Sequence, residues 1–353
     1  MSAKPEDTTD KDHGVLYMGI DLGSSRTSVS ASNGVRETVA SYVGYPKDVV
    51  ARKLLKKDVL FGDEALEKRL SLDFHRPLAH GKLKFATSSG KENEDSVRAT
   101  KDLLAEIIRR ARPRKDELIY AVIGVPAQAS IKNKEAILNA AKESVDSVML
   151  CSEPFAVAYG LDMLDDVLVI DIGAGTTDLC RMHGTMPEES DQLTINYAGD
   201  FIDDELMKAY AKSCKGAAFS IQMVKAVKEK YASVSDEMER ALVTFPVSGK
   251  PTQFDVTNDT RECCRSIIKP IVDGLQKLIE TFDPEFQEKL RSRVLIAGGG
   301  SLIRGLDYAI ESYMHERLGG GKVIRIEEPV YGGANGALKI AHDMPAEYWE
   351  KLR

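Results

Sequence analysis

The sequence is poor in the residue patterns that build disulfide frameworks and zinc sites. Its five cysteines, which include the adjacent pair Cys263 and Cys264, form no C-x-x-C motif, and its six histidines form no H-E-x-x-H motif. These absences argue against a small disulfide-linked fold and against a zinc site of those classes. Because free thiols persist in reducing compartments, we expect a cytoplasmic protein.

Long apolar runs and an excess of basic residues are also missing. The longest apolar stretches, such as residues 121–126, are far shorter than the roughly 20 residues that span a bilayer. Residues 1–13 contain neither a signal-like apolar run nor an amphipathic face, so we expect a disordered tail and no direct membrane insertion. The net charge of −7 provides no global positive field, and we expect no nucleic-acid partner.

Two common nucleotide-binding motifs are absent or incomplete. No G-x-x-x-x-G-K-[S/T] sequence occurs, which excludes a Walker-type ATPase. The glycine cluster that starts at Gly298 begins like G-x-G-x-x-G, but Ile303 occupies the position of the third glycine. The sequence therefore gives only a weak indication of a dinucleotide fold.

The most informative feature that is present is an internal repeat. An apolar run at 15–20 leads into Asp-Leu-Gly-Ser-Ser-Arg-Thr at 21–27, and another at 167–170 leads into Asp-Ile-Gly-Ala-Gly-Thr-Thr at 171–177. One such strand, aspartate and glycine turn is often only a tight turn. Two copies with matching flanks, separated by about 150 residues or one domain length, indicate two related halves.

Helical and strand-like patterns alternate through both halves, which favours α/β architecture. A proline at position 270 should split or bend the helical stretch that contains it. The expected helices are 101–111, 130–145, 203–212, 221–234, 261–282, 302–318 and 331–343. The expected strands are 118–123, 148–151, 293–296 and a hairpin of 241–247 with 253–256 that turns at 248–251.

Glycine turns bearing hydroxyl side chains are suited to phosphate, because their backbone amides converge on an anion without an obstructing Cβ. The turns at 23–27 and 173–177 could hold a triphosphate from opposite sides, with the glycine cluster at 297–301 as a third wall. Asp21 and Asp171 stand beside these turns and are suited to Mg²⁺, directly or through its waters. Each aspartate could also be only a turn-capping residue.

Three further polar residues have both a functional and a structural interpretation. Glu153 follows an expected strand and could orient a water molecule, or it could be an exposed glutamate at a helix start. Lys228 and Glu229 could contact a ribose or base from a helix, or they could form a solvated charged face.

In their order along the chain, these segments resemble the actin, Hsp70 and sugar-kinase superfamily. The segments that carry the resemblance lie at 21–23, 152–156, 171–178, 198–200, 227–230 and 297–301. Further segments, at 43–49, 53–55, 61–65, 122–127 and 348–349, resemble the bacterial actins associated with magnetosomes. Ser25 and Arg26 depart from the smaller residues usual in the first loop of shape-determining bacterial actins.

The resemblance implies an α/β actin-like ATPase fold with two related lobes, each a mixed sheet flanked by helices, and four subdomains. The implied boundaries are a tail at 1–13, subdomain IA at 14–41, 80–160 and 328–353, IB at 42–79, IIA at 161–199 and 262–327, and IIB at 200–261.

The resemblance also implies ATP and Mg²⁺ as cofactors and assigns roles to individual residues. Glu153, Asp171 and Asp178 are implied to be catalytic, and Asp21 and Asp171 to serve Mg²⁺ through water. The implied nucleotide-binding residues are Asp21, Gly23, Ser24, Ser25, Arg26, Thr27, Gly173, Ala174, Gly175, Thr176, Thr177, Gly199, Asp200, Lys228, Glu229, Gly298, Gly299, Gly300, Ser301 and Ile303.

In function, the resemblance implies an ATPase that forms head-to-tail filaments, with paired protofilaments, and that organises magnetosome vesicles through adaptor proteins on their membranes. A small-molecule kinase of the same superfold is an alternative, and it would need an acceptor pocket with its own base. An Hsp70-like module would need a substrate domain after the second lobe. A cell-shape or segregation actin is another alternative, of which the cell-shape type would need direct membrane attachment.

Overall fold

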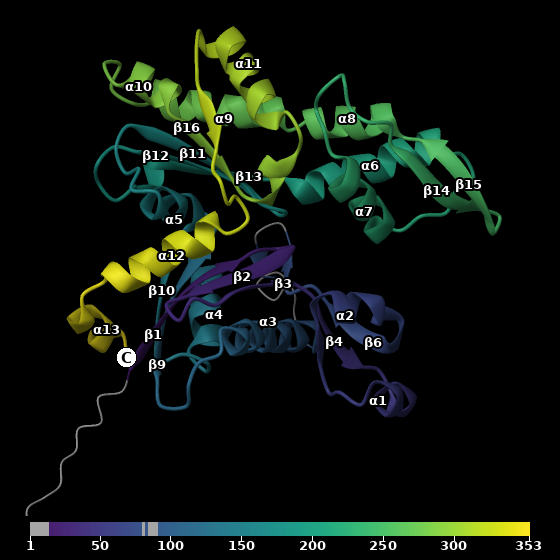
Figure 1. Ribbon diagram of the computed structural model, residues 1–353, viewed down its shortest axis with the longest axis horizontal. Coiled ribbons are helices and arrows are strands. Elements are labelled where there is room, and N and C mark those ends of the chain that lie inside the picture. The colour runs from purple at the N-terminus through teal and green to yellow at the C-terminus, as the bar shows by residue number, and fades with distance from the viewer. Residues whose placement is uncertain (1–13, 80–81, 84–90) are drawn as a thin grey trace, which may run out of the picture.

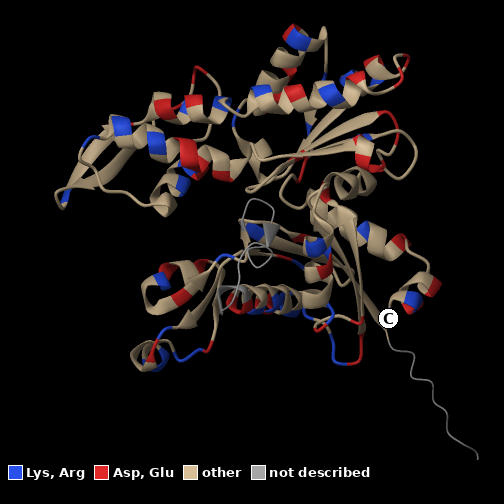
Figure 2. Cartoon of the chain, turned by 180° about the vertical axis from the view of Figure 1, so that it is seen from behind, with Lys and Arg blue, Asp and Glu red and all other residues tan. Residues whose placement is uncertain are grey.

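Two lobes, each containing a five-stranded mixed sheet, make up the structure (Figure 1). It is a computed structural model that describes residues 14–79, 82–83 and 91–353. The tail expected at 1–13 lies outside these described residues. Within the described ranges, no helix combines the length and the apolar character that crossing a membrane requires. Figure 2 shows Lys and Arg interspersed with Asp and Glu over both lobes.

The sheet of lobe I has β1 at its centre, with two parallel strands on one side and an antiparallel neighbour, β2, on the other. Its strands, in order, are β10 (Ser147–Ser152), β9 (Leu118–Val125), β1 (Val15–Leu22), β2 (Arg26–Ala31) and β3 (Arg36–Ala40). The helices α3 (Lys91–Arg110) and α4 (Ile131–Ala141) pack on one face. Those on the other face are α5 (Glu153–Gly160), α12 (Gly332–Asp343) and α13 (Ala346–Leu352).

The sheet of lobe II repeats this arrangement around β11. Its strands, in order, are β17 (Val323–Arg325), β16 (Val294–Ala297), β11 (Val167–Ile172), β12 (Thr177–Met182) and β13 (Gln192–Ile195). In both lobes the central strand is parallel to the two strands on one side and antiparallel to its other neighbour. The inference of two related α/β halves is therefore confirmed.

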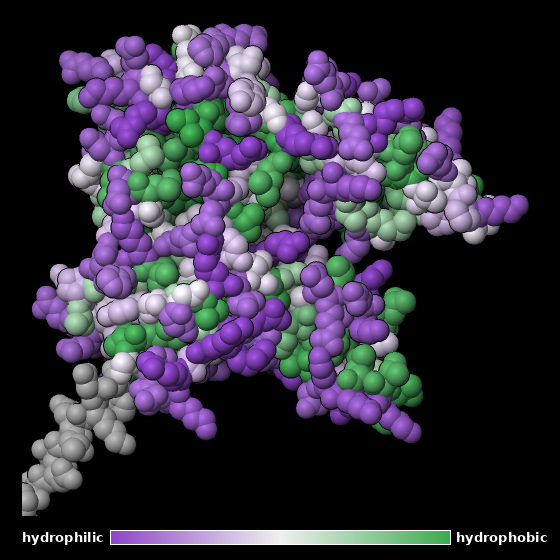
Figure 3. Space-filling model, viewed as in Figure 1, coloured by the Kyte–Doolittle hydropathy of each residue, from purple (hydrophilic) through white to green (hydrophobic). Residues whose placement is uncertain are grey.

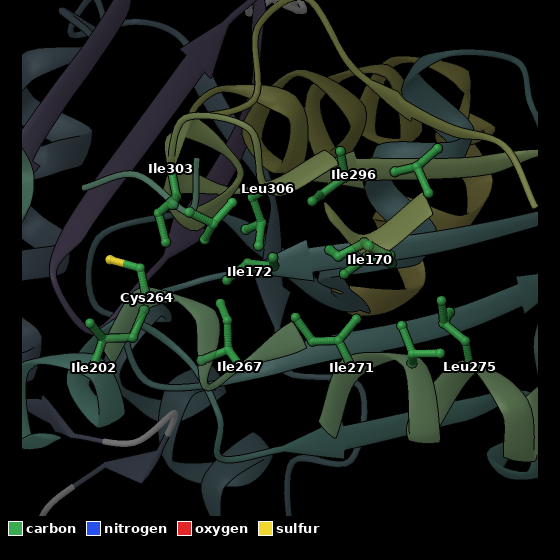
Figure 4. Packing of buried hydrophobic residues seen from close by; sticks show 14 of the residues in the cluster. Ile170, Ile172, Ile202, Cys264, Ile267, Ile271, Leu275, Ile296, Ile303 and Leu306 are labelled. Carbon is green, nitrogen blue, oxygen red and sulfur yellow. The ribbon is translucent and has the colours of Figure 1, made fainter. Parts of the chain in front are cut away.

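The helical stretch expected at 261–282 contributes apolar side chains to the core of lobe II (Figure 4). Residues 261–282 form two helices, α8 (Thr257–Arg265) and α9 (Ile268–Glu280), as one of the expected outcomes. The break falls at 266–267 and not at Pro270, because Pro270 lies in the first turn of α9. Backbone N–H groups in the first turn have no acceptor within the helix, so proline, which lacks this group, is tolerated there. The apolar side chains of α9, such as Ile271 and Leu275, pack beneath Ile170 of β11.

The helix expected at 302–318 begins four residues later. Gly299–Leu302 forms a short 3-10 turn (η4), and Gly305 has a φ of +77°, a conformation that favours glycine. The helix α11 (Leu306–Leu318) starts only after this residue. A further short helix, α10 (Gln287–Ser292), precedes β16.

An outer part extends from each lobe at the same side of the molecule (Figure 1). In lobe I it comprises β4 (Val43–Pro46), α1 (Val49–Leu55), β5 (Leu60–Phe61), α2 (Gly62–Glu67), η1 (Arg69–Ser71), β6 (Leu72–His75) and β7 (Leu78–Ala79). Strand β8 (Lys82–Leu83), which pairs with β7, follows this part in sequence. In lobe II it comprises α6 (Gly199–Ser213), α7 (Ile221–Tyr231), β14 (Leu242–Val247), β15 (Lys250–Asp255) and α8. We propose that these parts are the subdomains IB and IIB.

The hairpin of lobe II is tighter than expected from the sequence. Strand β15 begins at Lys250 rather than at residue 253, and Ser248 and Gly249 alone form the turn. Both have a positive φ, of 48° and 78°, as a two-residue type I′ turn requires.

Helices α5 and α12 approach so closely that only glycine fits at one position between them. A Cβ on Gly336 would lie 1.7 Å from the carbonyl oxygen of Ala156 in α5. A Cβ on Gly160, also in α5, would lie 2.9 Å from the Cα of Gly336. Because both obstacles are backbone, a side chain at 336 would force the helices apart.

We expect Gly336→Ala to lower the free energy of unfolding by about 3 kcal/mol or more, since overpacking here cannot be relieved by side-chain movement. Denaturant unfolding of the two proteins measures the difference. Gly14→Ala is the matched control, because a Cβ there would meet no atom nearer than 3.7 Å. Equal midpoints for Gly336→Ala and the unaltered chain would contradict the tight packing.

Candidate functional site

The ends of the two central strands bring the predicted carboxylates into one site. Asp21, the residue before the last in β1, lies beside Gly124 of β9, and Gly124 in turn pairs with Cys151 of β10. Glu153 begins α5 directly after β10, and its Cγ lies 3.4 Å from where a Cβ of Gly124 would be. Gly124 therefore leaves room for Glu153 beside Asp21. In lobe II, Asp171 near the end of β11 pairs with Asp178 of β12.

Three of these four carboxylates are buried, Asp21 is half-buried, and the four influence one another. Asp171 and Glu153 are 8% and 9% exposed, and Asp178 is fully buried. Burial raises the pKa of Asp21 to about 6. Burial, and then the charges of Asp21 and Asp178, raise the pKa of both Glu153 and Asp171 well above its ordinary value. Such a concentration of buried negative charge favours a bound cation.

Asp178 is fixed by hydrogen bonds to one of its carboxylate oxygens. Its Oδ1 accepts hydrogen bonds from the backbone N–H of Ala127 at 2.8 Å and from the hydroxyl of Thr194 at 2.5 Å. Its Oδ2 is buried without a partner among the described residues. Among the residues that the structure describes, no three His, Cys, Asp or Glu side chains lie close enough together to bind a metal directly. The donor set therefore fits a hydrated Mg²⁺ held through its waters.

Glycine at 298 is required by the position of Asp171. Gly298 has a φ of +76°, and a Cβ there would lie 2.3 Å from Asp171 Oδ1. The loop 298–301 is closed by a hydrogen bond from the hydroxyl of Ser301 to the carbonyl oxygen of Gly298, at 2.7 Å. A Cβ on Gly299 would meet no atom within 4 Å, so this residue is the open point of the loop, while Ile303 is buried.

The two predicted glycine turns occupy equivalent places in the two lobes, after β1 and after β11. The threonine at the end of each turn forms a hydrogen bond with another residue of its own lobe. The hydroxyl of Thr27 is 3.0 Å from that of Ser41, and the hydroxyl of Thr177 donates to the carbonyl oxygen of Tyr197 at 2.7 Å. Both threonines are fully buried, so their side chains stabilise the turns and do not face solvent. Thr176 is also buried.

The start of α6 is joined to the second glycine turn. The backbone N–H of Asp200 donates to the carbonyl oxygen of Ala174 at 2.7 Å, and that of Gly199 donates to Gly173 at 3.2 Å. Lys228 Nζ lies 2.7 Å from both the Gly199 carbonyl oxygen and Asp203 Oδ1, so its ammonium stabilises the start of α6. Glu229, next to Lys228 on α7, is exposed.

Arginine 76 is the main residue that the sequence interpretation missed. Arg26, which was expected near phosphate, is exposed at the start of β2. Instead, Arg76 Nε donates to the carbonyl oxygen of Ser24 at 2.8 Å, and one terminal nitrogen of Arg76 lies 2.8 Å from each carboxylate oxygen of Asp200. The ammonium of Lys225 donates to the hydroxyl of Ser25 at 2.5 Å. No local pattern marks Arg76 or Lys225, because their partners lie far away in sequence.

We expect the stability of the protein without nucleotide and Mg²⁺ to increase as the pH falls from 7.5 to 5. Carboxyls whose pKa is raised on folding bind protons more tightly in the folded state, so unfolding becomes more costly as they protonate. For Asp21 the gain is about 1 kcal/mol or more, and denaturant unfolding at several pH values measures the combined gain. Asp21→Asn should reduce the gain. Stability that falls steadily from pH 7.5 to 5 would contradict the raised pKa values.

Comparison with known proteins agrees with this architecture. The MreB/Mbl protein family model matches residues 16–347. The actin-like protein MamK of Paramagnetospirillum magneticum is 38% identical over 340 residues, which cover 96% of this chain and 95% of that protein. A solved structure described as a MamK double helical filament has a TM-score of 0.89 at 37% identity, covering 94% of this chain and 100% of the other.

A second solved structure, a non-polymerising MamK mutant bound to AMPPNP, has a TM-score of 0.70 at 36% identity, again covering 94% of this chain and 100% of that one. Fold and comparisons together define a protein of the actin-like class, with two related lobes. Within that class, the chain belongs to the MreB/Mbl family. The resemblance to bacterial actins found in the sequence is thereby confirmed.

Proposed function

We propose that this protein is a filament-forming ATPase that binds ATP with Mg²⁺ between its lobes and organises magnetosome vesicles in the cytoplasm. The observation that carries the proposal is the cluster of Asp21, Glu153, Asp171 and Asp178 beside two equivalent glycine turns, in which all but Asp21 are buried. Solved MamK relatives, one bound to AMPPNP and another described as a filament, support nucleotide binding and assembly.

Within this site each carboxylate has a distinct task. Mg²⁺, when bound, would neutralise charge on the phosphates during transfer. Asp21 and Asp171 would hold its waters from the two lobes. Glu153, whose pKa is raised by burial and by its acidic neighbours, would orient the attacking water and accept its proton. Asp178, with Oδ1 fixed and Oδ2 unpartnered, would help to order that water.

The surface offers an apolar area that assembly would cover. Val49, Val50 and Leu54 of α1 and Leu70 of η1 are between 71% and 85% exposed. They lie at the outer tip of lobe I, where Figure 3 shows hydrophobic residues at the lower right. Exposed apolar patches often mark contact surfaces. We infer that this tip contributes to head-to-tail contacts between subunits.

We also infer that two protofilaments pair in the filament. Adaptor proteins would then link the filament to the vesicle membranes.

Sedimentation combined with electron microscopy tests the proposal. Pellets and phosphate release are compared without nucleotide and with ATP, ADP or a non-hydrolysable ATP analogue, all with Mg²⁺. We expect filaments with ATP or its analogue, and phosphate release with ATP alone and no added acceptor. Protein that binds ATP yet neither assembles nor releases phosphate would contradict the filament function and indicate a small-molecule kinase.

A further inference from the structure

Two basic side chains bridge the lobes beside the first glycine turn. Arg76, just after β6 of lobe I, binds the Ser24 carbonyl oxygen in its own lobe and the Asp200 carboxylate at the start of α6 in lobe II. Lys225, on α7 of lobe II, reaches Ser25 of lobe I. The two bridges therefore cross between the lobes in opposite directions.

The Arg76 bridge also connects the two glycine turns to each other. Asp200 binds Arg76 through its side chain and the second turn through its backbone N–H, which donates to Ala174. Arg76 in turn binds the first turn through Ser24. One arginine and one aspartate thus link both turns, and any separation of the lobes must break at least one of these contacts.

These contacts are strong for their position. The guanidinium donates to both oxygens of the carboxylate, and charged hydrogen bonds of this kind are about twice as strong as neutral ones. The side chains of Arg76 and Asp200 are 24% and 10% exposed, so water screens them less than a surface pair. Burial lowers the pKa of Lys225, with the nearby charge of Arg76 as a further cause.

We propose that Arg76 is a positioning residue, and that Ser24, Ser25, Arg76, Asp200 and Lys225 form an inter-lobe clasp that controls nucleotide release. The clasp holds the two glycine turns at a fixed separation, and it must open before a nucleotide between them can leave. This inference rests on the proposed function, because it assumes that the nucleotide binds between these turns.

Release of a fluorescent ADP, displaced by excess ATP in a stopped-flow instrument, tests the clasp. We expect Arg76→Ala and Asp200→Asn each to release ADP at least fivefold faster than the unaltered protein. The double variant should release ADP no faster than the faster of the two single variants, because both substitutions remove the same interaction between Arg76 and Asp200. Arg76→Lys should be intermediate, since an ammonium cannot reproduce the fork of the guanidinium.

Arg36→Ala is the matched control, because Arg36 pairs with Glu328 at an exposed site within lobe I. Thermal unfolding identifies any variant that fails to fold, and Lys225→Gln then tests the second bridge independently. Unchanged release from folded Arg76→Ala, or effects that add in the double variant, would overturn the clasp. Absence of ADP binding by both the unaltered protein and Arg36→Ala would instead reject nucleotide binding, and the clasp with it.

Discussion

Glu153→Gln is expected to slow phosphate release by at least tenfold, and by up to about 10⁴-fold, while ATP-driven assembly continues. The substitution keeps the size and position of the side chain at the start of α5 but removes the proton acceptor. Burial and the neighbouring carboxylates raise the pKa of Glu153, which makes it a stronger base than an exposed glutamate. Phosphate release per sedimented subunit measures the effect, and filaments of the variant should persist longer.

Glu135→Gln is the appropriate control, because Glu135 is an exposed glutamate on α4. It should release phosphate at the normal rate. If Glu153→Gln also hydrolysed ATP at the normal rate, the attacking water would have to be oriented by another group.

Asp171→Asn is expected to reduce Mg²⁺-dependent phosphate release by about 10²-fold or more, because it removes one of the buried charges that would hold the hydrated ion. Phosphate release measured over a range of Mg²⁺ concentrations should show a weaker response to the metal. The same substitution should stabilise the protein in the absence of ligands, since it relieves repulsion among the four carboxylates. Greater thermal stability together with lower activity would separate this effect from simple unfolding.

Asp58→Asn, at an exposed position in lobe I, serves as the control for Asp171→Asn. It should change neither the rate nor the Mg²⁺ response. A normal rate and a normal Mg²⁺ response in Asp171→Asn would exclude Asp171 from metal binding.

The two-lobed fold was predictable because its signal is local and occurs twice. A buried strand followed by aspartate and a glycine turn appears at 15–27 and again at 167–177, and the two sheets are indeed organised around those strands. Helix limits were less predictable, because they depend on single backbone conformations. The proline at 270 fits within the first turn of α9, and the positive φ of Gly305 delays α11.

Part of the candidate site was also predictable, since strand ends bring Asp21 and Asp171 to it. The sequence could not show what the basic residues bind. The resemblance implies that Lys228 binds nucleotide, and the structure adds that its ammonium lies against the start of α6. The role proposed for Arg76 depends on contacts with Ser24 and Asp200, which come from two other segments of the chain.

The order of elements along the chain has a consequence for biosynthesis. The elements of lobe II, from β11 to β17, are continuous in sequence, whereas lobe I needs α12 and α13 to cover β1, β9 and β10. Trp349 of α13 is fully buried and stacks on Tyr120 of β9, with ring centroids 5.0 Å apart. On the ribosome, lobe II can therefore fold while lobe I still lacks these helices. A nascent chain would become competent to polymerise only after they emerge, which would keep unfinished chains out of growing filaments.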